Sequence, residues 1–392
     1  MILQPVDPNE QFKHRRHRAR RRRIIRRAVA AAFLLGAVSG LAIGVRVMAG
    51  EGSPTEQVAK SKPKAKPVKP AVKKPREMPY EVRGVHVTMA LASIRGKVDE
   101  YLSLRGLNTI ELDIKDENGE VGFSSPYAPL ARKVGASRDY YDPERVVARM
   151  RESGVYLIGR VVVFEDPVLS EARPDLAIKR PDGSVWRNHQ GLGWTNPYDK
   201  RVWDYNVDIA EAAARAGFDE VQFDYVRFPS DGDIDQIVFP GKTAAKPGWV
   251  IAQFLQYASK RLRPLGVRVS ADVFGLSATR DLGIGQVPKR IAPYLDAIYP
   301  MVYPSHYGPG EYNLPEPNDQ PGETVRSSMI DFNRQLRGKK TVVIPWLQDF
   351  TLGRTYTLDD IQAQIDAARV TGARGFLLWN AAGVYTDNAL AQ

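Results

Sequence analysis

The sequence lacks several features on which common enzyme classes depend, and cysteine is the first of them. With no cysteine among its 392 residues, the chain can form no disulfide bond, thiolate metal site or cysteine nucleophile. Residues 80–392 contain three histidines and no HxH or HExxH motif, so a histidine-rich metal centre is weakly supported and we assign no metal. Neither a GxSxG motif nor a Walker loop occurs, which argues against a serine hydrolase elbow and a P-loop. We expect no cofactor.

Positive charge is almost confined to the first eighty residues. Residues 1–80 hold 19 lysines and arginines against 5 acids, whereas the rest of the chain holds 37 against 40. The net charge of +11 therefore belongs to the N-terminal segment. A basic groove is poorly supported in the larger region, and we expect no nucleic-acid partner.

The N-terminal segment has the pattern of a membrane-inserted, exported protein. The basic stretch HRRHRARRRRIIRRA (14–28) precedes an apolar run at 28–45, which is close to the minimum length that spans a bilayer. By the positive-inside rule the basic stretch stays in the cytoplasm and the remainder is exported. We expect a cytoplasmic N-terminus at 1–27 and a transmembrane signal-anchor at 28–49. The alternative is cleavage near Val47-Met48-Ala49, which would release a secreted protein.

Lysine and proline alternate in KSKPKAKPVKPAVKKP (60–75), inside a linker that we place at 50–79. This composition favours an extended spacer, about 50 Å long at ~3.1 Å per residue. The simpler interpretation is a solvated linker between a membrane helix and the larger domain. The alternative is a stalk that also contacts an anionic cell-wall polymer or lipid headgroups.

Strand-like and helix-like patterns alternate from residue 80 to the end of the chain. The strand-like segments are 81–89, 109–116, 155–164, 219–229, 267–275, 297–307, 341–350 and 374–383. The helix-like segments between them are 91–106, 142–154, 196–217, 249–266, 286–296, 323–338 and 358–372. Eight strands with seven intervening helices predict an α/β fold, a closed (β/α)₈ TIM barrel over 80–392. An open, doubly wound sheet is the alternative, but no glycine-rich phosphate loop follows the first strand.

Polar side chains gather at the C-terminal ends of the predicted strands, where such barrels hold their active sites. Acids occur at five of the eight ends, and tyrosine and tryptophan share the same rim. The main candidates are His86, Glu111, Asp113, Lys115, Asp116, Glu165, Asp166, Gln222, Asp224, Arg227, Asp272, Tyr303, His306, Trp346, Asp349, Trp379 and Asn380. Aromatic faces beside carboxylates suit a sugar, because a pyranose stacks its C–H face on rings while its hydroxyls donate to carboxylates. Glycosidic cleavage also requires paired carboxylates.

Asp224 is the strongest catalytic candidate. It lies inside DEVQFDYVRFP (219–229), a strand-like segment in which an unpaired carboxylate is costly. Asp272 ends the neighbouring strand, so the two side chains could face a common pocket. Arg227 could pair with Asp224, but the spacing of three residues places them on opposite faces of a strand.

Structural roles compete with functional ones at several positions. We expect Asp116 and Asp166 to be caps or turn residues, because aspartate favours both positions. A histidine in a strand, such as His86, is more often a core residue with its hydrogen bonds satisfied than a functional one. Trp346 and Trp379 fit either barrel packing or a platform for a sugar. A Schiff base on Lys115 is a distant alternative, because nothing else in the sequence binds a phosphorylated substrate.

The motifs at nearly every strand end resemble those of one bacterial family. They include RGVHVT, NTIELDIKDENGEVGF, RVVVFEDP, GWTNPYD, EVQFDYVRFP, SADVFG, YPMVYPSHY and GFLLWNA, and they span about 80–390. The family consists of TIM-barrel domains of unknown function that are interpreted as glycoside hydrolases. It is related to the alpha-amylase-like glycosidase barrels.

The resemblance implies a nucleophile at Asp224, because alpha-amylase-like barrels carry an aspartate at the end of strand four. Their proton donor is a glutamate at the end of strand five, where this sequence has Asp272. Their arginine two residues before the nucleophile is replaced by Gln222. Three rival proton donors remain open, namely Asp113, Glu165 and Asp349. The residues that we expect to bind substrate are His86, Arg227, Tyr303, His306, Trp346, Trp379 and Asn380.

The sequence thus predicts a membrane-anchored, outward-facing TIM barrel. We expect it to hydrolyse an extracytoplasmic or cell-wall polysaccharide through paired carboxylates. The alternative is a non-catalytic barrel that binds polysaccharide or cell wall.

Overall fold

The computed structural model describes residues 73–391. The basic N-terminus, the predicted signal-anchor and the linker up to residue 72 lie outside the described residues and stay predictions. Within 73–391, none of the helices combines the length and the apolar character that a bilayer crossing needs.

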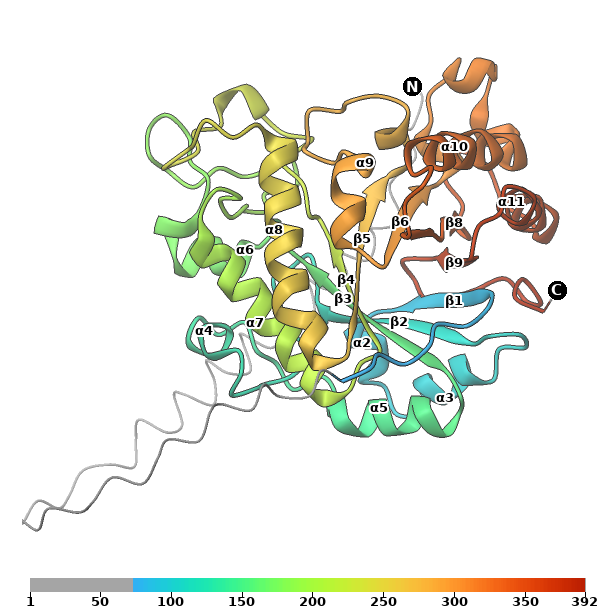
Figure 1. Cartoon of the computed structure of the whole chain (residues 1–392), viewed down its shortest axis with the longest axis horizontal. Helices are drawn as coiled ribbons and strands as arrows, with labels where there is room; N and C mark the ends of the chain where they lie inside the picture. Colours follow the sequence, from blue (N-terminus) through green and yellow to red (C-terminus); the bar gives the residue numbers. More distant parts are fainter. Residues whose placement is uncertain (1–72, 392) are drawn as a thin grey trace, which may run out of the picture. The chain divides into compact units, whose positions relative to one another are not determined.

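The strands of the described region close into one parallel barrel (Figure 1). They are β1 (Val82–Val87), β2 (Thr109–Lys115), β3 (Tyr156–Val162), β4 (Glu220–Asp224), β5 (Arg268–Phe274), β6 (Ala297–Val302), β7 (Val342–Val343), β8 (Trp346–Gln348) and β9 (Gly375–Trp379). The order around the barrel is β5-β4-β3-β2-β1-β9-β8-β6, and β6 pairs again with β5. All of these pairings are parallel, as expected when crossover helices join successive strands. The (β/α)₈ prediction is confirmed.

The seventh barrel position is occupied by two short strands. Both β7 and β8 pair with β6, and Ile344-Pro345 separates them. Proline has no N–H to donate to the ladder, so it interrupts a strand at this point. The predicted strand 341–350 is therefore present as two short strands, β7 and β8.

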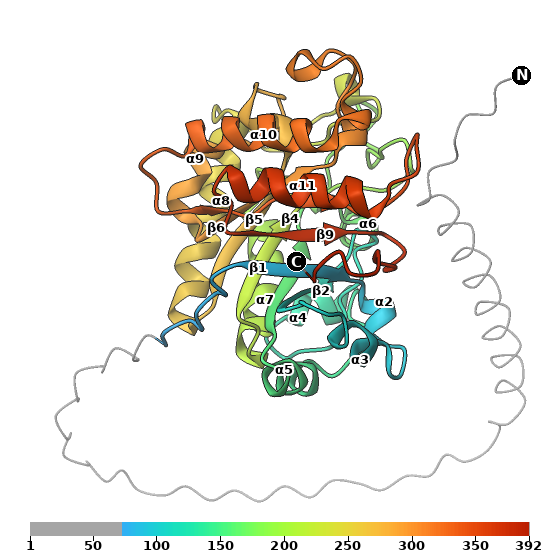
Figure 2. The same ribbon diagram turned by 90° about the vertical axis from the view of Figure 1, so that its right-hand side faces the viewer.

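Helices surround the barrel, and Figure 2 shows α10 and α11 running side by side along its outer face. The helices are α2 (Met89–Ala92), α3 (Lys97–Leu102), α4 (Pro129–Lys133), α5 (Pro143–Glu152), α6 (Pro167–Ala172), α7 (Lys200–Ala216), α8 (Pro247–Leu262), α9 (Pro288–Ile291), α10 (Pro321–Gln335) and α11 (Leu358–Val370). The single predicted helix 91–106 is wrong, because α2 and α3 replace it. Gly96 lies between them with a φ of 81°, a conformation that glycine adopts without strain and that ends helical geometry.

Two hydrophobic clusters follow from the alternation of side chains along each strand. One cluster fills the barrel interior and contains Val82, Tyr156, Ile158, Ala297, Tyr299, Tyr303, Ile344, Trp346 and Leu377. The other is larger and packs the outward-facing strand residues against the helices. Strand residues of the interior parity near the C-terminal ends are therefore carried toward the barrel axis, and they form the candidate site.

A buried carboxyl group lies lower in the same interior. Glu220 begins β4, and the hydroxyl of Tyr156 donates to its Oε2 over 2.9 Å. Burial raises the pKa of Glu220 to about 6, although neighbouring hydroxyls, including those of Ser270 and Tyr299, act in the opposite direction.

Glu220→Gln is expected to remove a pH dependence of stability. Because the folded pKa of about 6 exceeds the ordinary value of 4.5, the protonated carboxyl stabilises the fold below pH 4.5, and this contribution is lost as the pH rises to about 6. Relative to wild type, the free energy of unfolding of Glu220→Gln should gain about 2 kcal/mol between about pH 4 and pH 7. Denaturant unfolding at both pH values measures this difference. A constant difference would contradict the assigned burial.

Candidate active site

The fourth strand ends at Asp224 and does not continue to residue 229 as predicted. Tyr225 has a φ of 48°, a left-handed conformation that a non-glycine residue adopts only at a cost of about 1–3 kcal/mol. The turn brings the Tyr225 N–H onto Oδ1 of Asp224, over 2.6 Å. The prediction that Arg227 does not pair with Asp224 holds. The reason is the turn at Tyr225, because Arg227 lies beyond the end of the strand and strand parity does not apply to it. The strained turn holds the Asp224 carboxylate at the C-terminal end of the barrel.

Arg160, in the middle of β3, is the partner of Asp224. Its Nε and Nη2 donate to Oδ2 of Asp224 over 2.9 and 2.7 Å, and its Nη1 donates to Oδ1 of Asp113 over 2.7 Å. Burial by itself lowers the pKa of Arg160, but Asp224, Asp113 and two further acids outweigh it and raise the pKa well above its usual value. A permanently charged guanidinium therefore bridges two candidate carboxylates.

Arg160 is not among the residues predicted from the sequence, although a signal for it was present. The segment 155–164 is apolar except for this one arginine. The burial-cost argument that selected Asp224 applies equally to a guanidinium inside a strand.

Asp272, on β5, has a different environment. Its Oδ1 accepts hydrogen bonds from Gln222 Nε2 over 2.6 Å and from Trp346 Nε1 over 2.7 Å. Burial raises the pKa of Asp272 well above its ordinary value, and the negative charges of Asp224 and Glu111 raise it further. Asp272 is therefore a carboxyl group that retains its proton far above the pH at which an exposed aspartate ionises.

His86 and Glu111 complete the central cluster from β1 and β2. Nδ1 of His86 bonds to Oε2 of Glu111, and its Nε2 lies 3.8 Å from Oδ2 of Asp113. Burial alone lowers the pKa of His86, but Glu111 and Asp113 raise it to a net value above normal. Trp379 stacks on the imidazole with ring centroids 4.3 Å apart, and its ring also lies 5.4 Å from the guanidinium carbon of Arg160. His86 is thus bound into the charged network.

The two tryptophans have different roles. Trp346 is 1% exposed, and its N–H is committed to Asp272, so it positions the acid and offers no open face to a sugar. Trp379 is partly exposed above the cluster, which keeps it a candidate sugar platform.

Asp349 and Asn380 do not join the cluster. Both carboxylate oxygens of Asp349 accept from Thr386, one from its N–H over 2.9 Å and one from its hydroxyl over 2.7 Å. The side chain of Asn380 donates to the backbone carbonyl of Asp349. These contacts fasten the C-terminal segment, so Asp349 is a poor rival for the proton donor.

Asp116 and Asp166 make the structural contacts expected of them. Asp166 caps α6 by accepting from the Leu169 N–H over 2.8 Å. Asp116 accepts from the N–H groups of Asn118 and Glu120 in the turn after β2.

Lys115 points away from the barrel axis because β2 has a register shift between Asp113 and Lys115. The irregularity turns the ammonium group toward α7, where it contacts Asp166 over 2.6 Å and Asn206 over 2.9 Å. The side chain is completely buried, so no substrate reaches it from the barrel end. The geometry gives the Schiff-base alternative no support.

The remaining predicted residues lie around the rim. Tyr303 is buried, which raises its pKa well above normal, and the negative charges of Asp272 and Asp224 add to the effect. His306 is exposed and packs edge-on against Tyr303. Glu165 accepts from Asn188 over 3.0 Å.

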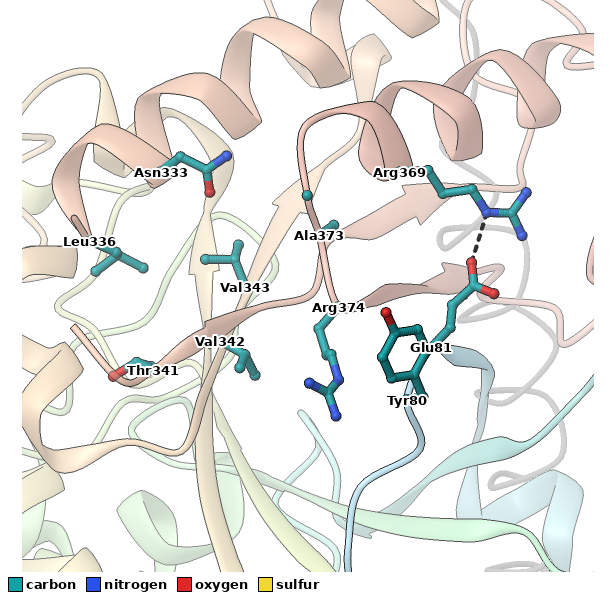
Figure 3. Close-up of a pocket in the computed structure, with 11 residues that line it drawn as sticks. Tyr80, Glu81, Asn333, Leu336, Thr341, Val342, Val343, Arg369, Ala373 and Arg374 are labelled. Carbon is teal, nitrogen blue, oxygen red and sulfur yellow. Dashed lines mark hydrogen bonds and ion pairs between the residues drawn. The ribbon is translucent and has the colours of Figure 1, made fainter. Parts of the chain in front are cut away.

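A pocket of about 560 Å³ opens at the other end of the barrel (Figure 3). Tyr80, Glu81 and Arg374 line it from positions just before β1 and β9. Its single acid, Glu81, pairs with Arg369 over 2.7 Å. Glycosidic cleavage requires two carboxyl groups, and barrel active sites lie at the C-terminal ends of strands, so we do not place the chemistry here.

Comparisons with known proteins concern the family and the fold. Residues 84–385 match the family described as "Putative glycosyl hydrolase domain". The structure of a hypothetical protein from Ruminiclostridium thermocellum is 36% identical and covers 48% of this chain and 97% of that chain, with a TM-score of 0.43. The PgaB (BpsB) glycoside hydrolase domain from Bordetella bronchiseptica is 14% identical and covers 76% of this chain and 94% of that chain, with a TM-score of 0.53. This second likeness shows the fold alone.

No curated protein sequence matches the chain at a significant level. The family match nevertheless covers well over half of the 392 residues and includes every strand end that supplies the central cluster. The chain therefore belongs to this family of glycosyl hydrolase domains.

Proposed function

We propose that the barrel hydrolyses glycosidic bonds in a polysaccharide, with Asp224 as nucleophile or base and Asp272 as proton donor. One observation carries the proposal. The two carboxyl groups lie on neighbouring strands, and their surroundings differ. Asp224 is bound by the Arg160 guanidinium, whereas the pKa of Asp272 is raised by burial and by the nearby charge of Asp224.

Two carboxyl groups in different surroundings suit the two roles in the reaction. In glycoside hydrolysis one carboxyl group protonates the leaving oxygen while the other attacks the anomeric carbon or activates water. Gln222 and Trp346 both donate to the same oxygen of Asp272, and this pair of bonds fixes the orientation of the acid. Asp113 and Glu165 remain alternatives to Asp272 as proton donor, and Asp113 accepts a hydrogen bond from Arg160.

The proposal extends to where the enzyme acts. The basic and apolar segments before residue 50 support export with a retained membrane anchor, and the Lys/Pro-rich linker supports a barrel held away from the membrane surface. A cell-wall or other extracytoplasmic polysaccharide is the substrate that such a placement makes accessible. Contact between the linker and an anionic cell-wall polymer is part of the same proposal.

The experiment that tests the proposal is reducing-end release from a panel of polysaccharides by the purified full-length protein. We expect release from at least one polymer. Binding to a polymer without release from any of them would favour the alternative, a non-catalytic polysaccharide-binding barrel.

Asp272→Asn should separate the proton donor from the rest of the machinery. Because the pKa of Asp272 is raised, its proton is lost only as the pH rises through that raised value, so wild-type kcat/KM should fall on the alkaline side. The variant should lose this limb and about 10²–10⁴-fold of the rate on unactivated substrates. Aryl glycosides with good leaving groups need little protonation and should be affected far less. An equal loss on both substrate types would assign the proton donor elsewhere.

A further inference from the structure

Arg227 is a second buried arginine at the C-terminal end of the barrel, and its surroundings differ from those of Arg160. It is 7% exposed, and its guanidinium carbon lies 5.0, 4.9 and 4.8 Å from the ring centroids of Trp194, Tyr225 and Phe274. Among residues 73–391, no carboxylate oxygen comes within 4.0 Å of its nitrogen atoms. Aromatic faces therefore hold a guanidinium that has no anionic partner in this region.

The hydrogen bonds of Arg227 leave one edge of the guanidinium unused. Its Nη1 donates to the carbonyl of Phe228 over 3.2 Å and to the hydroxyl of Ser230 over 3.0 Å. Within the described part of the chain, Nε and Nη2 donate to no group, and neither atom is fully shielded from solvent. A guanidinium edge with two parallel donors matches the two oxygens of a carboxylate.

The position of this edge relates it to the proposed reaction. Tyr225, one of the three rings, directly follows Asp224, and Phe274 lies two residues after Asp272. Arg227 therefore lies beyond the ends of β4 and β5, at the end of the barrel that holds the two carboxyl groups. A sugar bound between Asp224 and Asp272 would direct a substituent toward this guanidinium edge. The substituent could belong to that sugar or to the next sugar unit of the chain.

A buried charge without a counter-ion is costly, and stacked aromatic rings offset only part of that cost. Arg160 shows how the same fold treats a guanidinium that serves the internal structure, because three of its nitrogens donate to carboxylates. The aromatic rings around Arg227 orient the plane of its guanidinium and leave the N–H groups of Nε and Nη2 available for hydrogen bonds. This is the arrangement expected of a residue whose anion arrives with the substrate.

We propose that Arg227 binds the carboxylate of an acidic sugar, so that the substrate class is a polysaccharide containing uronic acid or another carboxylate-bearing unit. The inference rests on the proposed function and names its substrate. Arg227 is a specificity residue in this account, and the bond-breaking steps remain with Asp224 and Asp272.

The test uses pairs of polymers that differ only in charge. The full-length protein is assayed on polygalacturonate, alginate and glucuronan, each beside its carboxyl-reduced neutral counterpart. We expect higher kcat/KM on the acidic member of at least one pair, and we expect Arg227→Gln to lower the acidic-to-neutral ratio at least about tenfold, mainly through KM. Arg227→Lys, which keeps the charge without the fork, should restore part of the ratio. Arg374→Gln, at the opposite end of the barrel, is the matched control and should leave the ratio unchanged.

The ratio distinguishes specificity from a merely structural role. If Arg227 only stabilised the turn after β4, its replacement would lower both rates equally and leave the ratio constant, and that result would overturn the inference. Equal wild-type kcat/KM on both members of every pair would also overturn it while leaving the proposed hydrolysis intact.

Binding decides the case in which no polymer is cleaved and the proposed hydrolysis itself fails. Affinity electrophoresis of Asp224→Asn in gels with each polymer pair then reports the site without turnover. Retardation by a polyuronate that disappears in Asp224→Asn/Arg227→Gln would support the acidic-sugar site. Absence of any charge-dependent retardation would overturn it.

Discussion

Asp224→Asn is expected to lower kcat for polysaccharide hydrolysis by about 10³-fold or more, because an amide can neither attack the anomeric carbon nor activate water. The substitution is nearly isosteric. The amide oxygen can still accept from Arg160, although the bond from the Tyr225 N–H to the other oxygen is lost, and the Asp113 end of the same guanidinium is untouched. The fold should therefore survive, and the loss should reside in the chemical step.

Two controls make this result interpretable. Thermal unfolding should show a melting temperature close to that of the wild type, and affinity electrophoresis should show that Asp224→Asn still binds the polymer. Asp349→Asn is the matched carboxylate control, because Asp349 is fastened to Thr386 away from the central cluster and should retain most activity. A wild-type rate in Asp224→Asn would remove Asp224 from the chemistry.

Arg160→Met is expected to have the largest effect on stability. Arg160 is the shared partner of Asp224 and Asp113, and all three side chains are buried. Its removal deprives both carboxylates of their hydrogen-bonded guanidinium and leaves the His86 ring, 3.8 Å away, beside Asp113. Breaking a buried ion pair by removing one partner typically costs about 3–5 kcal/mol. We expect a decrease of this size in the free energy of unfolding, together with loss of activity, because Asp224 loses the contacts that orient it.

Denaturant unfolding measures the effect, and a surface arginine provides the control. Arg149 pairs with Asp99 over 2.8 Å in solvent, and pairs of that kind contribute about 0–1 kcal/mol. Arg149→Met should therefore unfold almost as the wild type does. If Arg160→Met were as stable as Arg149→Met, the bridge would not be what holds the two carboxylates in place.

The barrel could be predicted from the sequence because eight strand patterns alternate with helical ones, and this periodicity depends on side-chain burial, which local sequence records well. The errors lie where one residue overrides the pattern. Pro345 splits the seventh strand, and Gly96 divides the segment predicted as one helix into two short ones.

The site was predictable in part for a related reason. An acid inside a strand signals a burial cost, and this cost was the first reason to select Asp224, beside its place at a strand end and the family resemblance. Its partner was not found, because Arg160 lies on another strand and the contact forms only when β3 pairs with β4. Lys115 shows the opposite limit, since its parity matched Asp113 until the shift in register turned it toward α7. Irregularities of this kind leave no periodic trace in a single sequence.

The roles of Trp346 and Asp349 became clear only from individual hydrogen bonds in the structure. Trp346 was equally compatible with packing and with a sugar platform until its N–H was found to donate to Asp272. Asp349 was a candidate proton donor from the sequence, but in the structure both of its carboxylate oxygens accept hydrogen bonds from Thr386. Such contacts join residues far apart in the chain, so composition and spacing could not distinguish the alternatives.

The most direct test of the account is reducing-end release by the wild type and by Asp224→Asn, measured side by side on the same polysaccharide panel. The account predicts release by the wild type from at least one polymer and release reduced to near background by the variant at matched folding and binding. Equal release by the two proteins, or binding by the wild type with no release from any polymer, would contradict it.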